Sequence, residues 1–242
     1  MQTRMLTVTL ALSLAGCAGS AHQTSFNVPL ADPNEATNRV VADVQSTANR
    51  IVVRPVNHVY EAVVPAVARD RLTAARRNLD EPRIFVNNVL QGRLGAANLT
   101  MGRFLGNSIF GIGGLFDIAT AAGAPRQTGD FGQTLHVWGF QSGDYLVLPF
   151  LGPSTPRDAV GRVVDMAMDP VGWTFFLTLG TPNADFVTGG LAGFDIVEQG
   201  RQLDEIEKDS LDPYARMKSL WEQNRASELR KAFEPANGSE TR

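Results

Sequence analysis

The fold class is decided by residues 32–55, which read DPNEATNRVVADVQSTANRIVVRP. Asp32 can cap a helix, Pro33 suits the first helical position, and Glu35 stands three residues past the cap. The apolar residues that follow recur at the spacing of one helical stripe, namely Val40, Val41, Val44, Ala48, Ile51 and Val52. We therefore predict a helix that begins at Asp32 and ends or bends at Arg54-Pro55.

Similar helix signals recur along the rest of the chain. A short helix is predicted over Val56 to Val64, stopped by Pro65. The next segment predicts an amphipathic helix, with Ala68, Leu72, Ala75 and Leu79 on one stripe and Arg69, Thr73 and Arg76 on another. Further helix starts are predicted at Ser154-Thr155-Pro156 and at Asp212-Pro213. The chain is thus predicted to be mainly α.

Residues 131–150, FGQTLHVWGFQSGDYLVLPF, are the exception to this helical pattern. Aromatic and β-branched residues surround two glycines, which favours a hairpin or an ordered loop. We predict a short strand over Asp144 to Pro149, with the turn at Gln141-Ser142-Gly143. Two apolar segments, at 171–179 and 186–197, are each about half as long as a bilayer-crossing helix. They are predicted to be buried core or helices that lie in one leaflet.

The first residues have the pattern of a bacterial lipoprotein signal. Arg4 gives a positive start, Leu6 to Ala15 form an apolar core, and Leu14-Ala15-Gly16-Cys17 ends it at the only cysteine. We expect a signal peptide at 1–16 and a covalent diacylglycerol and N-acyl lipid on Cys17, which anchor the chain. Residues 17–31 are predicted to be a flexible spacer, 32–235 a helical domain, and 236–242 a polar tail.

Composition and charge exclude some classes of function. A predicted export signal with a pI of about 5.6 argues against nucleic-acid binding. Arginines outnumber acids between Arg39 and Arg103, whereas acids outnumber bases from Asp185 onward. That asymmetry suits a face toward anionic lipid or an acidic partner, and equally two ordinary solvated helix faces.

Catalytic patterns are sparse. The three histidines fall in no metal-binding spacing, and the glycines from Gly111 to Gly114 precede no phosphate-binding lysine. Ser142, Ser154 and Asp165 are modest candidates for chemistry. We therefore predict that the chain is not an enzyme, holds no metal and needs no cofactor beyond the covalent lipid.

Short motifs follow one another in a distinctive order from Asp32 to about Arg225. They are Asp32-Pro33-Asn34-Glu35 with Asn38-Arg39, Val53-Arg54-Pro55, Asn78-Leu79-Asp80-Glu81-Pro82, Val86-Asn87 with Leu90-Gln91-Gly92, Arg103-Phe104 with Asn107, Gly111-Ile112-Gly113-Gly114-Leu115-Phe116-Asp117-Ile118-Ala119, Phe131-Gly132-Gln133-Thr134-Leu135, Trp138-Gly139, Tyr145-Leu146-Val147-Leu148-Pro149, Gly152-Pro153-Ser154-Thr155 with Arg157-Asp158, and Ser210-Leu211-Asp212-Pro213-Tyr214. In this order, and after a lipoprotein signal, they resemble the MlaA (VacJ) family of outer-membrane lipoproteins. The chain departs from the family pattern at Thr37, His136 and Asp144.

The resemblance implies a ring-like bundle of amphipathic helices that lies in the inner leaflet of the outer membrane and faces the periplasm. Such a protein removes misplaced phospholipids from the outer leaflet and thereby maintains lipid asymmetry. It passes them through a polar channel to a soluble periplasmic lipid carrier, and it associates with a trimeric outer-membrane porin. A structural lipoprotein that braces a porin, and an enzyme that degrades or transfers lipids, remain the alternatives.

Two groups of residues are candidates for the site. The first would shape or gate the channel, and comprises Gly111, Gly113, Gly114, Asp117, Phe131, Gly132, Leu135, Trp138, Gly139, Tyr145 and Pro149. The second is the first-helix motif, Asp32, Pro33, Glu35, Asn38 and Arg39. Trp138 and Tyr145 could equally anchor the protein at a membrane interface.

Overall fold

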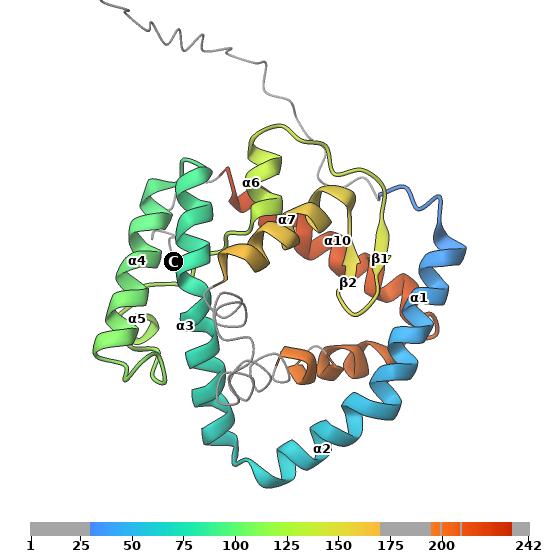
Figure 1. Ribbon diagram of the computed structural model, residues 1–242, viewed down its shortest axis with the longest axis horizontal. Coiled ribbons are helices and arrows are strands. Elements are labelled where there is room, and N and C mark those ends of the chain that lie inside the picture. The colour runs from blue at the N-terminus through green and yellow to red at the C-terminus, as the bar shows by residue number, and fades with distance from the viewer. Residues whose placement is uncertain (1–29, 170–194, 199, 209, 234–242) are drawn as a thin grey trace, which may run out of the picture.

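The computed structural model describes residues 30–169, 195–198, 200–208 and 210–233. Its helices follow one another around a ring, as Figure 1 shows. One side of the ring consists of α1 (Glu35–Ala48), the π-helix η1 (Asn49–Val53), α2 (Arg54–Val63) and α3 (Ala66–Leu90). The other side consists of α6 (Phe131–Val137), β1 (Leu146–Leu148), β2 (Gly152–Ser154), α7 (Pro156–Met168) and α10 (Pro213–Lys231).

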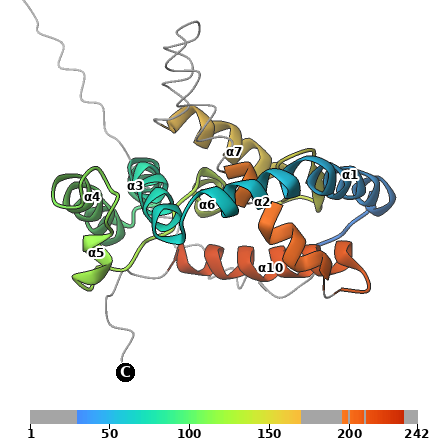
Figure 2. The same cartoon turned by 90° about the horizontal axis from the view of Figure 1, so that it is seen from below.

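Two further helices lie outside the ring, against α3. They are α4 (Leu94–Ile109) and α5 (Ile118–Ala121). Seen from below, α1, α2, α3 and α4 lie in one flat layer, with α10 beneath it and α7 above it (Figure 2). The predicted fold class, a mainly helical ring, is confirmed, and its position in a membrane leaflet stays a prediction.

The start of the first helix differs from the prediction. Helix α1 begins at Glu35, after an Asn34 cap whose side chain makes no capping hydrogen bond. Asp32 instead accepts hydrogen bonds from Asn38 Nδ2 at 2.8 Å and from the Tyr214 hydroxyl at 2.5 Å. The predicted cap at Asp32 was wrong, because tertiary partners outcompete the local amide groups for this carboxylate.

The predicted boundary at Arg54-Pro55 is a change of helix type and not the end of the helical run. Residues 49–53 form a π-helix, and α2 continues directly from it at Arg54, with Pro55 in the first turn of α2. The amide of Arg54 still donates to the carbonyl oxygen of Asn49, so the hydrogen bonds of the π-helix run up to Pro55, which has no amide hydrogen to donate. The predicted boundary at Pro65 is confirmed, since α2 ends at Val63 and Pro65 caps α3.

Residues 131–150 form a helix followed by a hairpin strand. Asp130 accepts a hydrogen bond from the amide of Gln133 at 2.8 Å, and this cap starts α6 where an ordered loop or strand was predicted. The predicted strand is confirmed as β1, but its partner is β2, and Leu146 pairs antiparallel with Ser154. The hairpin turn therefore lies at 149–151 and not at Gln141-Ser142-Gly143. Phe150 adopts a positive φ of 63° there.

The starts of the two later helices are confirmed. The Thr155 side chain accepts a hydrogen bond from the amide of Asp158 at the start of α7. The Asp212 side chain accepts one from the amide of Ala215 at the start of α10. In both helices a proline occupies the first turn, as the local sequence indicates.

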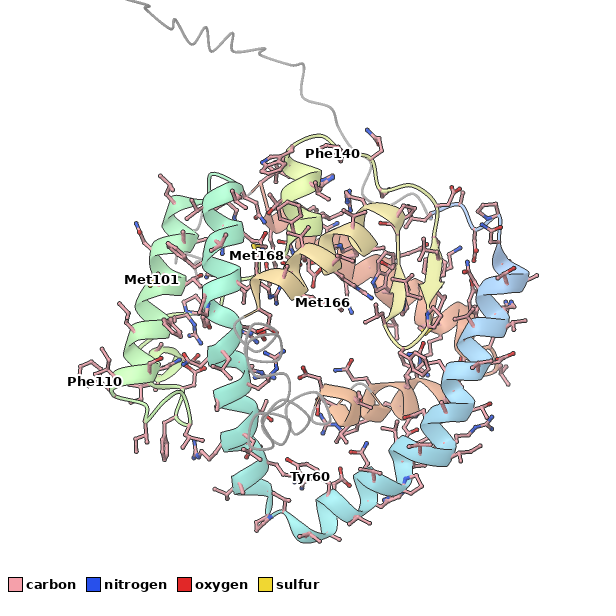
Figure 3. The ribbon with its side chains drawn as sticks, in the orientation of Figure 1. Tyr60, Met101, Phe110, Phe140, Met166 and Met168 are labelled. Carbon is pink, nitrogen blue, oxygen red and sulfur yellow. The ribbon has the colours of Figure 1, made fainter. Side chains whose placement is uncertain are left out.

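The packing is inverted relative to that of a water-soluble protein. Among the largest fully buried side chains of the described residues, only Tyr145 carries an aromatic ring, and the others are polar: Gln133, Glu81, Asn87, Asn88, Thr100, Thr134, Thr155 and Ser154. Large apolar side chains are exposed along α1, η1 and α2 and at the end of α4, among them Val44, Ile51, Val59, Val63, Ile109 and Phe110. In Figure 3, Met101, Phe110 and Phe140 lie on the outer rim. Exposed apolar surface of this extent is typical of proteins that face lipid or a partner.

No helix in the described part of the chain is long and apolar enough to cross a membrane. The predicted apolar segment at 171–179 and most of the one at 186–197 lie outside the described residues. The signal peptide, the spacer up to residue 29 and the polar tail lie outside them too. These assignments stay predictions.

Candidate functional site

A charged cavity of about 490 Å³ lies between α3, α7 and α10, next to the start of α6. Ten of its lining residues are ionisable: Arg76, Asp80, Arg83, Asp130, Asp158, Arg162, Asp165, Asp169, Arg225 and Glu228. Met166 also lines it, and Figure 3 places this residue on the side of α7 that faces the middle of the ring. The cavity therefore belongs to the inner side of the ring.

Helix α7 supplies three of the charged residues from one face, and its C-cap residue, Asp169, supplies a fourth. Asp158, Arg162, Asp165 and Asp169 follow the three- and four-residue spacing that places side chains on one stripe. Because the Thr155 cap fixes where α7 begins, it also fixes the direction of this stripe. Other positions of the same helix expose apolar side chains, such as Val160 and Val163.

Helix α3 presents a matching polar stripe to α7. Arg83 Nη1 lies 3.3 Å from Asp165 Oδ1, and Asn87 Nδ2 donates to the same carboxylate at 2.9 Å. Arg76 Nη2 lies 3.7 Å from Asp169 Oδ2. Burial raises the pKa of Asp165 despite these partners. Along the cavity, α3 and the residues of α7 and its C-cap therefore contact each other through charged and polar side chains.

Arg225 connects α10 to the other two elements of the cavity. Its guanidinium donates to Asp130 at 2.6 and 2.9 Å and to Asp158 at 2.9 Å through two nitrogens. Burial alone would raise the pKa of Asp130, but the charge of Arg225 holds it below its usual range. The two carboxylates in turn raise the pKa of Arg225, although burial opposes this.

Two glycines allow α6 and α7 to approach closely enough for this network. A Cβ atom on Gly161 would lie 2.4 Å from the backbone nitrogen of Gly132. A Cβ atom on Gly132 would lie 2.6 Å from both Arg225 Nη2 and Asp158 Oδ1. Neither position has room for a side chain. Because both residues are glycine, α6 and α7 can approach closely enough for Arg225 to reach both Asp130 and Asp158.

The first-helix motif joins the two ends of the ring. Asn38 Nδ2 donates to the carbonyl oxygen of Tyr145, and its Oδ1 accepts from the amide of Val147. Asp32 binds Tyr214 on α10, and Arg39 pairs with both Glu35 and Asp212. Pro33 lies two residues before the start of α1. The motif therefore closes the ring between α1, β1 and α10.

A helical segment at 200–208 and the short helical stretch 195–198 cross the lower part of the ring, drawn in orange in Figure 1. Asp195 pairs with Arg76 at 3.0 Å, and Asp204 pairs with Arg54 at 2.6 Å. Asn49, the first residue of the π-helix, donates to the carbonyl oxygen of Gly200 and to Asp204. These residues are thereby bound to α3 through Arg76 and to η1 and α2 through Asn49 and Arg54.

The candidate glycine turn lies away from the cavity. Gly111, Gly113 and Gly114 follow α4, on the outer side of α3 (Figure 1). Gly114 has a φ of 89°, and a Cβ atom there would lie 2.5 Å from the side chain of Asn78. Asp117 caps α5, and although partial burial raises its pKa, bonds from Thr120 and its other partners lower it to about 2.

The candidates from the 131–150 block lie in different surroundings. The Phe131 amide donates to Asp165, so Phe131 and Gly132 contact the cavity residues. Tyr145 is fully buried in a small core that it shares with Ala42, Val147, Tyr214 and Met217. Trp138 is half exposed and its Nε1 donates to the carbonyl oxygen of Leu90. Leu135 is half-buried, while Gly139 and Pro149 are exposed. Their roles in gating stay predictions.

The candidates for catalysis do not converge. Ser154 is fully buried and its hydroxyl donates to the carbonyl oxygen of Thr155. The backbone carbonyl of Ser142 accepts from the amide of Arg157, and Asp165 lies in the charged cavity. Across the residues that the structure describes, no group of three histidine, cysteine, aspartate or glutamate side chains could hold a metal ion.

Sequence reasoning missed most of the cavity. Asp165 was singled out, but Asp130, Arg162 and Arg225 were not. The charged stripe of α7 could have been found from its helical spacing once the Thr155 cap was recognised. No local signal marks Asp130 or Arg225, because they reach the cavity from two different elements that only the fold brings together.

Comparison with known proteins identifies the family. The model of the MlaA lipoprotein family matches residues 30–228. The chain belongs to the MlaA family. The resemblance inferred from the ordered motifs is therefore confirmed.

The chain is similar to several MlaA relatives over most of its length. The intermembrane phospholipid transport system lipoprotein MlaA of Haemophilus influenzae is 31% identical over 230 residues, which cover 93% of this chain and 90% of the relative. The Escherichia coli K12 protein of the same name is 31% identical over 227 residues, 91% of this chain and 86% of the relative. An uncharacterized Rickettsia felis protein is 35% identical over 192 residues, 78% and 74% of the two chains.

The ring is similar to a solved structure too. That structure is described as the structural basis for maintenance of bacterial outer membrane lipid asymmetry. It is 28% identical to this chain, with a TM-score of 0.65, and the match covers 82% of this chain and 99% of the other. The likeness therefore extends over most of this chain.

Proposed function

We propose that this chain is an outer-membrane lipoprotein that removes mislocalised phospholipids from the outer leaflet and so maintains lipid asymmetry. The observation that carries the proposal is the inverted packing of an MlaA-family ring, with charged residues lining an inner cavity and apolar side chains exposed outside. A phospholipid crossing the apolar layer needs a polar route for its head group. The charged cavity offers such a route beside the middle of the ring.

The finer parts of the proposal concern position and partners. We infer that lipid on Cys17 anchors the chain to the inner leaflet of the outer membrane, facing the periplasm. Exposed valines of α1 and α2 support an in-plane position, since helices in one leaflet need not span the bilayer. A trimeric outer-membrane porin is the proposed partner within the membrane. A soluble periplasmic lipid carrier is the proposed acceptor of the lipid.

The proposed transport requires no catalytic step. A conduit lowers the barrier for lipid transfer by providing a polar path, and it needs no nucleophile. Alanine at Ser142, Ser154 and Ser210 should therefore leave lipid transport intact, with the outer-leaflet phospholipid of the complemented strain as the readout. Loss of transport in the Ser142 or Ser154 variant, with the Ser210 variant active as the matched control, would support the enzymatic alternative.

The deciding measurement is the amount of phospholipid in the outer leaflet of a strain that lacks this protein. We expect exposed phospholipid to rise, the intact chain to restore the wild-type level, and Cys17→Ala to fail. If deletion changes nothing, the structural lipoprotein that braces a porin replaces the transport proposal. If Cys17→Ala complements fully, transport stands and the anchor does not matter.

A further inference from the structure

One arginine of the charged cavity differs from the other three in its partners. Arg76, Arg83 and Arg225 each lie within 4.0 Å of at least one carboxylate. Arg162 forms no such ion pair with any residue that the structure describes, although its side chain lines the same cavity. Arg162 is therefore the arginine of this cavity whose guanidinium has no carboxylate at contact distance among the described residues.

The position of Arg162 is set by the hairpin. Its Nη1 donates to the carbonyl oxygen of Leu151 at 2.6 Å, and its Nη2 donates to that of Pro153 at 2.8 Å. A guanidinium carries five N–H donors in a planar fork, so these two bonds leave three donors for another acceptor. The β1–β2 hairpin thus fixes the position of the Arg162 guanidinium and leaves N–H donors available for a ligand.

The surroundings of Arg162 make an anionic ligand favourable. Burial lowers its pKa, which means that the charged form is partly dehydrated without full compensation. A partly dehydrated guanidinium gains strongly from a phosphate, because charge-assisted, two-point hydrogen bonds match the geometry of both groups. The cavity volume of about 490 Å³ falls in the range of small-ligand sites.

We propose that Arg162 binds the phosphodiester of a phospholipid head group as the lipid enters this cavity. The inference rests on the proposed function and deepens it, because it names the residue that recognises the lipid. Arg162 projects from the face of α7 that lines the inside of the ring, while the acyl chains of the lipid can follow the apolar side chains of the same helix.

The rest of the lining selects the kind of head group. Six carboxylates and four arginines line the cavity, so the lining is acidic even before Arg162 is neutralised by a phosphate. An acidic lining attracts an ammonium group and repels a second negative charge. Trp221 adds an aromatic ring, a side chain that favours cations at its face. The site is therefore selective for a zwitterionic, ethanolamine-type head group over an anionic, glycerol-type one.

Binding of deacylated head groups tests this directly. The full-length, lipidated chain in detergent micelles is titrated with glycerophosphoethanolamine, glycerophosphoglycerol and inorganic phosphate, and broadening of each phosphorus NMR line gives the affinity. These probes do not partition into micelles, so any broadening reports the protein. We expect glycerophosphoethanolamine to bind more tightly than either other probe. Equal binding of glycerophosphoglycerol, or tighter binding of inorganic phosphate, would overturn the head-group assignment.

Variants separate a ligand contact from a structural role. Arg162→Gln should weaken glycerophosphoethanolamine binding about tenfold or more, as expected for a hydrogen-bonded charge. Arg50→Gln removes an exposed arginine on the opposite side of the ring and should bind as the wild type does. If Arg162→Gln melts early, Arg162→Lys keeps the charge and one carbonyl bond, and it should still bind more weakly. Wild-type affinity in both Arg162 variants refutes the inference.

The outcome is independent of the test of function. If a strain without this protein accumulates exposed phospholipid, the transport proposal is supported, even where the Arg162 variants bind glycerophosphoethanolamine as tightly as the wild type. The inference would then be wrong and the proposed function would stand. Selective binding that depends on Arg162, with no change in the deletion strain, would instead separate lipid recognition from transport.

Discussion

Replacing Arg225 with methionine removes the charge that connects three elements of the cavity. Only 11% of the Arg225 side chain is exposed, and its partners Asp158 and Asp130 are 5% and 27% exposed. Methionine keeps much of the volume and the apolar stem but donates no hydrogen bond. Two carboxylates are then left without their main counter-charge in a poorly hydrated site.

The expected cost follows from breaking a buried ion pair on one side. Removal of one partner typically destabilises a protein by about 3–5 kcal/mol, because the remaining charge is buried without compensation. For a chain of this size each kcal/mol lowers the melting temperature by about 2–4 °C. Arg225→Met should therefore melt about 6–20 °C below the wild type.

The pH dependence gives a second, independent test. Arg225 holds the pKa of Asp130 below its usual range, so this contribution to stability is present at neutral pH and is lost as the pH falls through the lowered pKa. In the variant that contribution is missing, and protonation of the freed carboxylates relieves the strain. The difference between wild type and Arg225→Met should thus shrink as the pH falls from 7 to about 3.

Thermal unfolding followed by circular dichroism in detergent is the assay. Arg230→Met changes an exposed arginine one and a half turns further along the same helix, and it should shift the free energy of unfolding by no more than about 0.5 kcal/mol. If both variants melt alike, or if the loss in Arg225→Met is the same at both pH values, the ion-pair reasoning fails.

Three further predictions concern the scaffold. Arg103→Met should cost about 3–5 kcal/mol, because Glu81 stays buried at 1% exposure, while the double change with Glu81→Met should recover most of it in denaturant titrations. Gly161→Ala should destabilise by about 1–3 kcal/mol, since its Cβ would press on the α6 backbone, whereas Gly102→Ala at an open helical position should gain up to about 1 kcal/mol. Asp32→Asn should be less stable than the wild type at pH 7, and the difference in the free energy of unfolding should narrow toward pH 3. Burial raises the pKa of the Asp32 carboxyl, but the hydrogen bonds that it accepts hold the pKa below its usual value. The stability that the charged carboxylate contributes is therefore lost on acidification. A stability difference between wild type and Asp32→Asn that stays constant with pH would contradict the role of the Asp32 charge.

Local signals predicted most of the helices correctly, and their failures have identifiable causes. The caps at Thr155 and Asp212 are confirmed because each side chain accepts from an amide three residues further on, and Asp212 does so while it also pairs with Arg39. The cap at Asp32 failed because a tyrosine hydroxyl from α10 competes for the same carboxylate. The hairpin turn was misplaced because a glycine-containing turn signal preceded β1, while the actual turn uses Phe150 in the left-handed region.

The candidate site was harder to predict than the fold. The glycine turn at 111–114 carries a strong local signal, yet it serves packing between α3 and α4. Asp130 and Arg225, whose contact defines the cavity, stand 95 residues apart and neither lies in a recognisable motif. Charged residues on helices are ordinarily exposed, so nothing in their spacing says that they face inward.

Signals between residues a few positions apart, namely caps, prolines and periodicity, were enough to predict the helical class and the boundaries of most helices. The ordered motifs were enough to predict the family, and the lipid anchor stays a prediction. Only the tertiary structure decided which face of each helix is buried. Amphipathic helices have two faces and the sequence does not say which solvent each one meets. Here the polar faces of α3, α7 and α10 are buried because their ion pairs compensate one another, and the apolar faces remain outside, where a membrane can cover them.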